Sequence, residues 1–280
     1  MKFLLPLAAA IASAQVPTIS MTSAGVGVTN AASFQSGIAA GGIITIFGTN
    51  LGAAPGQTLV APGSPWPPQL GNTSVTMNGV TAPVYYVLNQ NGSEQLSVQA
   101  PWSLAGMNSA TVMVTTPMGT STPLTVPVSA AQPGIFLLDG ASSCATHSAN
   151  GSIVTSTYPA AQGEYVTIYM TGLGVVEDAP PTGFAAPGAT GSTVDPQVTI
   201  GQLSAPVSYA GLAPGFIGLY QVNLQVPGTS GVQDVQVQAF TGTSENTFRI
   251  FTSNIGKITV QPGTCGLACS EPPAPNLRGK

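Results

Sequence analysis

The chain has 280 residues, of which 43% are hydrophobic and only 5% are charged, and its net charge is −4. This composition supports a packed core and argues against intrinsic disorder, which combines low hydrophobicity with high charge. The five basic residues form no cluster, whereas nucleic acids and anionic membrane surfaces are bound by clustered cations. We therefore expect neither as a partner.

Residues 1–14 have the pattern of a secretory signal peptide. Lys2 precedes an apolar run over residues 3–12, and a small-x-small cleavage motif ends at Ala14. This is the order of a signal sequence, and the run is shorter than the roughly 20 residues that span a bilayer. We predict cleavage before Gln15 and a mature protein that is secreted or held at the cell surface. A buried N-terminal helix is the alternative.

Three sequence blocks occur twice, in the same order. The pairs are Gly41–Gly52 (GGIITIFGTNLG) with Gly163–Gly174 (GEYVTIYMTGLG), Val75–Tyr86 with Val198–Tyr209, and Gln95–Pro101 with Gln221–Pro227. The offset between the copies drifts only from 122 to 126 residues. A period of this kind indicates a duplicated domain.

Each copy has the pattern of short β-strands. Ile44 and Ile46 flank Thr45 in the first copy, as Val166 and Ile168 flank Thr167 in the second. Period-two alternation rich in Val, Ile and Thr is typical of half-buried strands. Turn signals such as Asn-Gly separate the runs, and no stretch has a sustained helical period. Each copy offers about six or seven strands, as in an Ig-like domain.

We predict an all-β fold of two tandem Ig-like antiparallel β-sandwiches. The expected units are the signal peptide 1–14, a first sandwich 25–139, a linker 140–155, a second sandwich 156–260 and a disordered Pro/Gly/Cys-rich tail 261–280. The linker is assigned because its residues are small and polar. Since it is short, a single fused β-structure with an intimate contact between domains is the alternative.

Both copies carry a long Pro/Gly-rich segment after their first block, over residues 53–69 and 175–195. Loops longer than about 12 residues are often functional. The first loop presents Trp66 between two prolines and the second presents Phe184. We predict these two aromatic residues as binding residues, because aromatic side chains anchor many interfaces. The alternative is that Trp66 folds back to cap its own core.

Several blocks resemble a known family. GGIITIFGTNLG, APVYYV, QAPW, PGIF, GEYVTIYMTGLG and AGLAPGFIGLYQVNLQVP are similar to the uncharacterised domain found at the C-terminus of secreted acidobacterial (Solibacter-type) proteins. The single units also resemble IPT/TIG Ig-like modules. The resemblance covers roughly residues 25–260 and implies export, a pair of β-sandwiches and no known catalytic residue. Family members commonly carry larger N-terminal modules, and here little precedes the domain.

Catalytic residue types are scarce. The single histidine, His147, has Asp139 nearby in sequence, but no G-x-S-x-G nucleophile motif accompanies them. We expect a solvated His147 in the linker. Glycoside hydrolysis uses two carboxylates across a cleft, and candidates such as Glu164 and the adjacent Glu177 and Asp178 are few. Calcium-loop and phosphate-loop motifs are absent. We predict no catalytic residue, no metal site and no cofactor.

Three cysteines, Cys144, Cys265 and Cys269, suit an oxidising compartment. We predict a disulfide between Cys265 and Cys269 with Cys144 free, although three pairings are open. The alternative is a structural zinc ion held by the three cysteines and His147.

Together these features predict a secreted, non-enzymatic Ig-like module for extracellular binding or surface and matrix assembly. Its partner would be a glycan, the cell wall or another surface protein, and low surface charge makes self-association feasible. The alternatives are a carbohydrate-active or other hydrolytic enzyme, an accessory subunit of one, or a mechanical spacer. A deep pocket lined by at least two acids, or by His147 with an acid, would favour the enzyme, because fold alone does not determine function.

Overall fold

The computed structural model describes residues 15–20, 27–242 and 248–262. The predicted signal peptide, Cys265, Cys269 and nearly all of the predicted tail lie outside these residues. Within them, no helix has the length and apolarity needed to cross a membrane.

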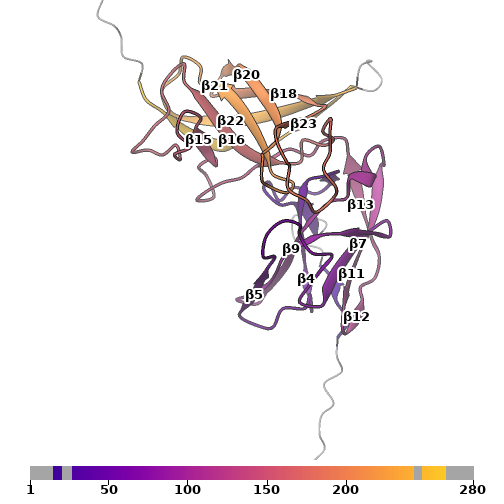
Figure 1. Ribbon diagram of the computed structural model, residues 1–280. Helices are drawn as coiled ribbons and strands as arrows, with labels where there is room; N and C mark the ends of the chain where they lie inside the picture. The colour runs from indigo at the N-terminus through magenta and orange to yellow at the C-terminus, as the bar shows by residue number, and fades with distance from the viewer. Residues whose placement is uncertain (1–14, 21–26, 243–247, 263–280) are drawn as a thin grey trace, which may run out of the picture.

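The first sandwich consists of two sheets (Figure 1). One sheet contains β1 (Thr18–Ile19), β2 (Val28–Asn30), β4 (Ile43–Thr49), β5 (Gln57–Val60), β9 (Val84–Gln90) and β10 (Ser93–Gln99). Their order is β1-β4-β10-β9-β5, with β2 also on β4. The other sheet contains β3 (Ile38–Ala39), β6 (Gln69–Leu70), β7 (Thr73–Met77), β8 (Val80–Ala82), β11 (Ser109–Thr116), β12 (Gly119–Thr120) and β13 (Leu124–Ser129). A 3₁₀ turn, Trp102–Leu104, follows β10.

The second sandwich repeats this plan. One sheet contains β14 (Gly134–Ile135), β15 (Ala145–His147), β16 (Tyr165–Thr171), β17 (Thr190–Gly191), β20 (Val207–Leu212) and β21 (Tyr220–Gln225). The other contains β18 (Asp195–Ile200), β19 (Leu203–Ala205), β22 (Gly231–Thr241), β23 (Arg249–Thr252) and β24 (Gly256–Val260). The prediction of an all-β fold with two tandem Ig-like sandwiches is confirmed.

Strand pairing shows that the duplication extends to the register. Ile46 of β4 pairs with Leu96 of β10, and the equivalent residues, Ile168 of β16 and Val222 of β21, pair in the second sandwich. The alternation of apolar and polar residues in the sequence matches the burial of the strands. In β7 and β18, for example, every second residue points into the core. Each sandwich has its own buried hydrophobic cluster.

Both sandwiches also carry a β-bulge at the same place. Between β9 and β10 the register skips Tyr85, and between β20 and β21 it skips Ser208. A bulge redirects a side chain and increases local twist. The two extra residues are equivalent in position but different in chemistry, since one is aromatic and the other is small and polar.

The segment 140–155, which we predict as the linker, lies inside the second sandwich. It contains β15, which pairs with β16, and β14 already joins the same sheet at Gly134. The second sandwich therefore begins at Gly134, and the connection between the sandwiches is confined to residues 130–133. Small polar composition suggested a linker, but Ala145 and His147 alternate inward and are buried.

The two sandwiches keep separate sheets but meet in an intimate junction. The backbone N–H of Ile43 donates to Thr171 Oγ1 at 2.8 Å, and the Thr171 hydroxyl donates to the carbonyl of Gly218 at 2.8 Å. Trp102 packs against both hydrophobic cores. The intimate contact that we considered for a fused structure thus occurs between two distinct sandwiches, which lie at an angle to each other (Figure 1).

Close approach at the junction depends on glycine. Gly172 has φ +83°, and a Cβ there would lie 2.0 Å from the carbonyl oxygen of Gln132 and 2.8 Å from Asn30 Nδ2. Asn30 Nδ2 in turn donates to that carbonyl at 2.6 Å. A side chain at position 172 would therefore separate the two sandwiches.

Candidate functional site

The two Pro/Gly-rich loops bind each other across the junction. The backbone N–H of Trp66 donates to the carbonyl of Gly183 at 2.8 Å, and the N–H of Ala185 donates to Ser64 Oγ at 2.9 Å. The N–H of Gly183 also donates to Gln99 Oε1 at 2.6 Å. Segments more than 100 residues apart in sequence are thereby held together.

The first loop is more ordered than its composition suggests. It includes β5, which pairs with β9 as the edge strand of the sheet. Beyond β5 the chain turns through a cis peptide bond between Ser64 and Pro65. This path delivers Trp66 to the junction.

The indole of Trp66 stacks on the ring of Tyr85, with ring centroids 4.7 Å apart and planes inclined by 17°. Tyr85 is the bulged residue of β9 and is 38% exposed. Trp66 is half-buried and lies outside both clusters of described core residues. The ring therefore packs on a surface aromatic residue rather than into the core of its own sandwich.

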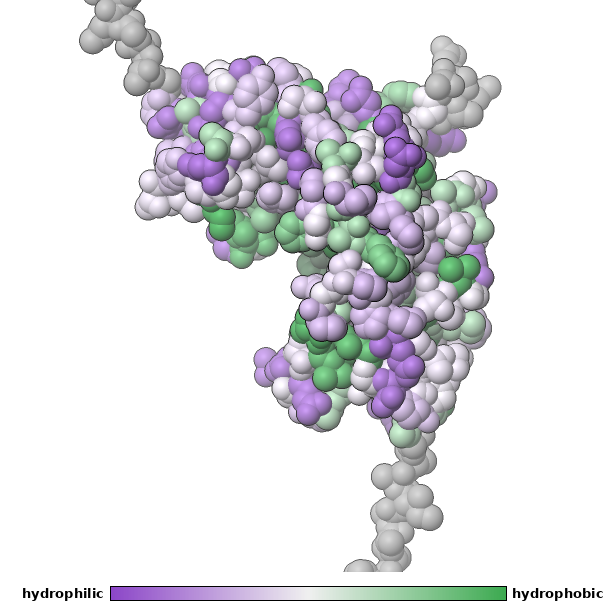
Figure 2. Space-filling model, in the orientation of Figure 1, coloured by the Kyte–Doolittle hydropathy of each residue, from purple (hydrophilic) through white to green (hydrophobic). Residues whose placement is uncertain are grey.

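A recess opens beside this aromatic pair, with a cavity volume of about 290 Å³. We call it the junction recess. Trp66 and Tyr85 line it from the first sandwich, and Phe216 and Ile217 line it from the second. None of the described residues that line it is charged. Figure 2 shows hydrophobic residues along the concave side of the angle between the sandwiches.

Phe184, the other predicted binding residue, is not brought into this recess. Its side chain is 47% exposed, and its backbone N–H donates to the carbonyl of Pro181 in its own loop. Phe216, which is 56% exposed, occupies the second wall instead. Sequence reasoning missed Phe216 and Tyr85. The signal for Tyr85 was the replacement of a tyrosine by Ser208 in the second copy of an otherwise similar block.

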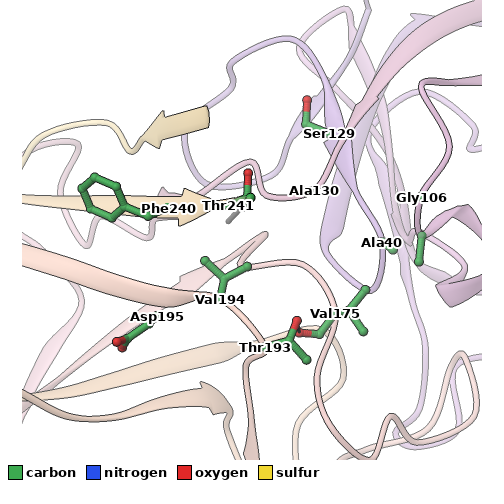
Figure 3. Close-up of a pocket in the computed structure, with 12 residues that line it drawn as sticks. Ala40, Gly106, Ser129, Ala130, Val175, Thr193, Val194, Asp195, Phe240 and Thr241 are labelled. Carbon is green, nitrogen blue, oxygen red and sulfur yellow. Dashed lines mark hydrogen bonds between the residues drawn. The ribbon is translucent and has the colours of Figure 1, made fainter. Parts of the chain in front are cut away.

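A second cavity of about 410 Å³ lies elsewhere along the junction (Figure 3). Ala40, Gly106 and Ser129 line it from the first sandwich, and Asp195 and Phe240 from the second. Asp195 is the one titratable group among its described lining residues. A binding or catalytic site combines several convergent polar groups, so we assign no role to this cavity.

His147 is buried, with 4% of its surface exposed, and it is not the solvated linker residue that the sequence suggested. Its Nδ1 lies 2.6 Å from Glu164 Oε1, and its Nε2 lies 3.3 Å from the carbonyl oxygen of Tyr158. The rings of His147 and Tyr158 are 4.1 Å apart. Burial results from β15, which turns His147 toward the inside of the sheet.

This geometry does not form a catalytic triad. Both ring nitrogens of His147 face carboxylate or carbonyl oxygens, and no described hydroxyl or thiol is hydrogen-bonded to them. A triad requires a nucleophile on one of these nitrogens. Asp139 is engaged elsewhere: backbone hydrogen bonds from Ser142 and Ala141 hold its pKa below the ordinary value.

His147 and Glu164 nevertheless line a cavity of about 410 Å³ together with Asn150, Tyr158 and Tyr165. We call it the polar recess. A pocket of this kind would favour the enzyme alternative. However, Glu164 is the one carboxylate among the residues that line it, whereas glycoside hydrolysis uses two across the scissile bond.

Cys144 is half-buried, and burial raises the pKa of its thiol. Cys144 directly precedes β15, and His147 is the third residue after it, so alternation along the extended chain places the two side chains on opposite faces of the sheet. This arrangement argues against a zinc ion shared by both. Cys265 and Cys269 lie outside the described residues, so their disulfide stays a prediction.

No family model and no curated protein matches the chain. Among solved structures, the I9–I11 tandem of titin is similar at 10% identity and a TM-score of 0.22, covering 88% of this chain and 66% of its own. A chimeric titin Z1Z2 carrying a decorin peptide is similar at 14% identity and a TM-score of 0.21, covering 88% and 97%. The Escherichia coli adhesin FdeC is similar at 15% identity and a TM-score of 0.22, covering 82% and 63%. All three are distant likenesses, and the chain spans about two thirds of the first structure's length.

Proposed function

We propose that this chain is an exported, non-enzymatic Ig-like module that binds a partner outside the cell at the junction recess. One observation carries the proposal. Two loops distant in sequence are hydrogen-bonded across the junction and hold Trp66 beside an open, uncharged recess. A junction that served only to join two domains would bury this ring instead of lining a cavity with it.

Export rests on the sequence of residues 1–14, which has the order of a signal peptide. The resemblance to secreted acidobacterial (Solibacter-type) proteins supports the same location. A non-enzymatic role rests on the chemistry of the described residues. The one histidine of the chain lacks a nucleophile partner, and the junction recess has no titratable group other than Tyr85.

The lining of the junction recess sets the chemistry of its partner. Aromatic and aliphatic side chains without charge favour an apolar, uncharged surface. The non-polar face of a cell-wall glycan or an apolar side chain of another surface protein meets this requirement. An anionic partner is disfavoured because no described cation lines the recess.

The test is retention of mature protein, residues 15–280, on purified cell walls and on whole cells. Trp66→Ala should reduce retention about tenfold or more, because interface anchors of this type contribute about 2 kcal/mol. Phe248→Ala is the control, since Phe248 is an exposed aromatic residue (45%) of the second sandwich that does not line the junction recess. Phe184→Ala tests the second predicted binding residue.

The folded state of each variant is checked by chemical denaturation, so that lost retention is not mistaken for unfolding. Equal retention of the wild type and Trp66→Ala would contradict binding at the junction recess. Retention by neither protein would contradict the binding function and leave the structural role, whose first measurement is the oligomeric state.

A further inference from the structure

One end of the second sandwich carries His147. The equivalent end of the first sandwich is the one that packs against the second sandwich. In both copies a glutamine side chain holds the turn that opens the first repeated block. Gln99 Nε2 donates to the carbonyl of Gly41 at 3.1 Å, and Gln225 Nε2 donates to that of Gly163 at 2.8 Å. In the first copy the other sandwich covers this turn, and in the second copy the turn is exposed.

The side chains at the two ends differ at equivalent positions. At the docked end, Gly42 and Ile43 follow the turn. At the free end, Glu164 and Tyr165 take their places, and His147 takes the place of Asn30 in the adjacent strand. A glycine, an isoleucine and an asparagine at the docked end are thus replaced by a carboxylate, a phenol and an imidazole at the free end. These replacements create the polar recess.

The polar recess is organised before any ligand arrives. The Glu164 carboxylate accepts from His147 Nδ1 at 2.6 Å and from the backbone N–H of Ala161 at 2.8 Å. Asn150 Nδ2 donates to the Tyr158 hydroxyl at 3.3 Å. Because His147 is buried and lies between the Glu164 carboxylate and the backbone carbonyl of Tyr158, it positions Glu164 and Tyr158 at the recess. Pre-organised groups bind without the entropic cost of ordering side chains.

Two aromatic rings remain available beside these polar groups. Tyr158 is 48% exposed and Tyr165 is 52% exposed, and both line the recess. The recess therefore combines ring faces with a carboxylate, a carboxamide and the phenol hydroxyls. A pyranose ring has the complementary character, since its C–H groups form an apolar face and its hydroxyls form a polar rim.

Charge selects among ligands of this shape. Glu164 is the one carboxylate among the described lining residues, and no described lysine or arginine lines the recess with it. An acidic sugar would bring a second negative charge close to Glu164, and like charges at short range repel. The described lining of the polar recess offers a carboxylate, a carboxamide and phenol hydroxyls but no lysine or arginine, so it favours a neutral ligand.

We propose that the polar recess binds a neutral saccharide, with a pyranose ring stacked on Tyr165 and its hydroxyls hydrogen-bonded to Glu164 and Asn150. This site is separate from the junction recess and does not depend on the function proposed there. The ligand is bound and not hydrolysed, because Glu164 has no second carboxylate facing it among the described residues.

Calorimetric titration of residues 15–280 with soluble oligosaccharides tests this site. The probes are cellotetraose and chitotetraose as neutral ligands and tetragalacturonic acid as the acidic one. At least one neutral tetramer should bind saturably and more tightly than the acidic one. Tyr165→Ala should weaken binding about fivefold, since the stacking contribution of one ring is about 1 kcal/mol. Tyr165→Phe should retain it, because the ring face is kept.

Two further variants serve as controls. Phe248→Ala removes an exposed aromatic ring elsewhere in the second sandwich, and Trp66→Ala removes the anchor of the junction recess. Phe248→Ala should bind the saccharide as the wild type does, whereas Trp66→Ala tests whether the junction recess takes up any of it. A parallel chromatographic assay should show the tetramer intact after prolonged incubation.

Four results would overturn the proposal. They are no binding of either neutral tetramer, tighter binding of the acidic tetramer, unchanged affinity in Tyr165→Ala, and release of shorter sugars by the wild type. Loss of binding in Trp66→Ala with full binding in Tyr165→Ala would place the saccharide in the junction recess instead.

Discussion

The two copies of the repeat share a backbone but use the same end differently. In the first copy this end lies against the second sandwich, and its Ile43 N–H is bonded to Thr171. In the second copy the equivalent end faces solvent and carries His147 and Glu164. Equivalent turns, glutamine bonds and strand registers are retained. Duplication therefore preserved the scaffold, while a few side chains at one end decided between docking and an open recess.

The bulges between β9 and β10 and between β20 and β21 also show one shared backbone feature carrying different side chains. The bulge presents Tyr85 in the first copy, where the ring stacks on Trp66. In the second copy it presents Ser208, whose hydroxyl donates to the backbone of Asn223 in its own sheet. The same backbone irregularity thus places an aromatic ring beside the junction recess in one copy and a hydroxyl that bonds within its own sheet in the other.

The largest expected effect contrasts the two tryptophans. Trp102→Ala should destabilise the protein by about 3–5 kcal/mol, because Trp102 packs against both cores and its removal leaves a cavity between them. Trp66→Ala should cost about 1 kcal/mol, the value of a stacked aromatic pair. Urea denaturation measures both, and equal losses would contradict the assignment of Trp102 to the junction and Trp66 to the surface.

The next contrast concerns equivalent glycines with positive φ. A Cβ on Gly41 would lie 2.0 Å from the ring of Trp102, whereas one on Gly163 would meet no atom within 4 Å. Gly41→Ala should therefore cost about 3 kcal/mol from overpacking and backbone strain. Gly163→Ala should cost about 1 kcal/mol from strain alone. Similar free energies of unfolding for the two variants would contradict the claim that the Gly41 turn is tightly packed and the Gly163 turn is not.

Equivalent threonines provide a smaller contrast. Thr171 is fully buried, accepts from Ile43 and donates to Gly218. Thr171→Val should cost about 2 kcal/mol, because it leaves buried backbone groups without partners. Thr49, its counterpart, is exposed, and its hydroxyl is hydrogen-bonded to that of Thr18 at the surface, so Thr49→Val should change stability by about 0.5 kcal/mol or less. The comparison fails if thermal unfolding ranks them in the opposite order.

The smallest expected effect concerns the thiol beside the free end. Because burial raises the pKa of Cys144, its reaction with a thiol reagent at pH 8 should be slower in the native protein than in denaturant. Denaturation without reductant should expose one reactive thiol per chain if Cys265 and Cys269 are paired. Three reactive thiols would contradict that disulfide.

The sequence by itself determined the architecture. Alternation in segments such as Ile44–Ile46 and its copy Val166–Ile168 is local, so it predicts strands without knowledge of the tertiary fold. The repeated blocks predict two similar units, and the register observed in the structure shows that each copy pairs its strands in the same way. The Pro/Gly-rich loops also stood out, because their composition and length are visible in the chain alone.

Only the tertiary structure decided what these parts contact. Segment 140–155 is polar enough for a linker, yet its β15 completes a sheet, because pairing with β16 satisfies backbone groups that composition does not reveal. The pairing of His147 with Glu164, the stacking of Trp66 on Tyr85 and the meeting of the two loops all join residues that are apart in sequence. Such contacts depend on how sheets and domains pack, and local periodicity carries no information about that packing.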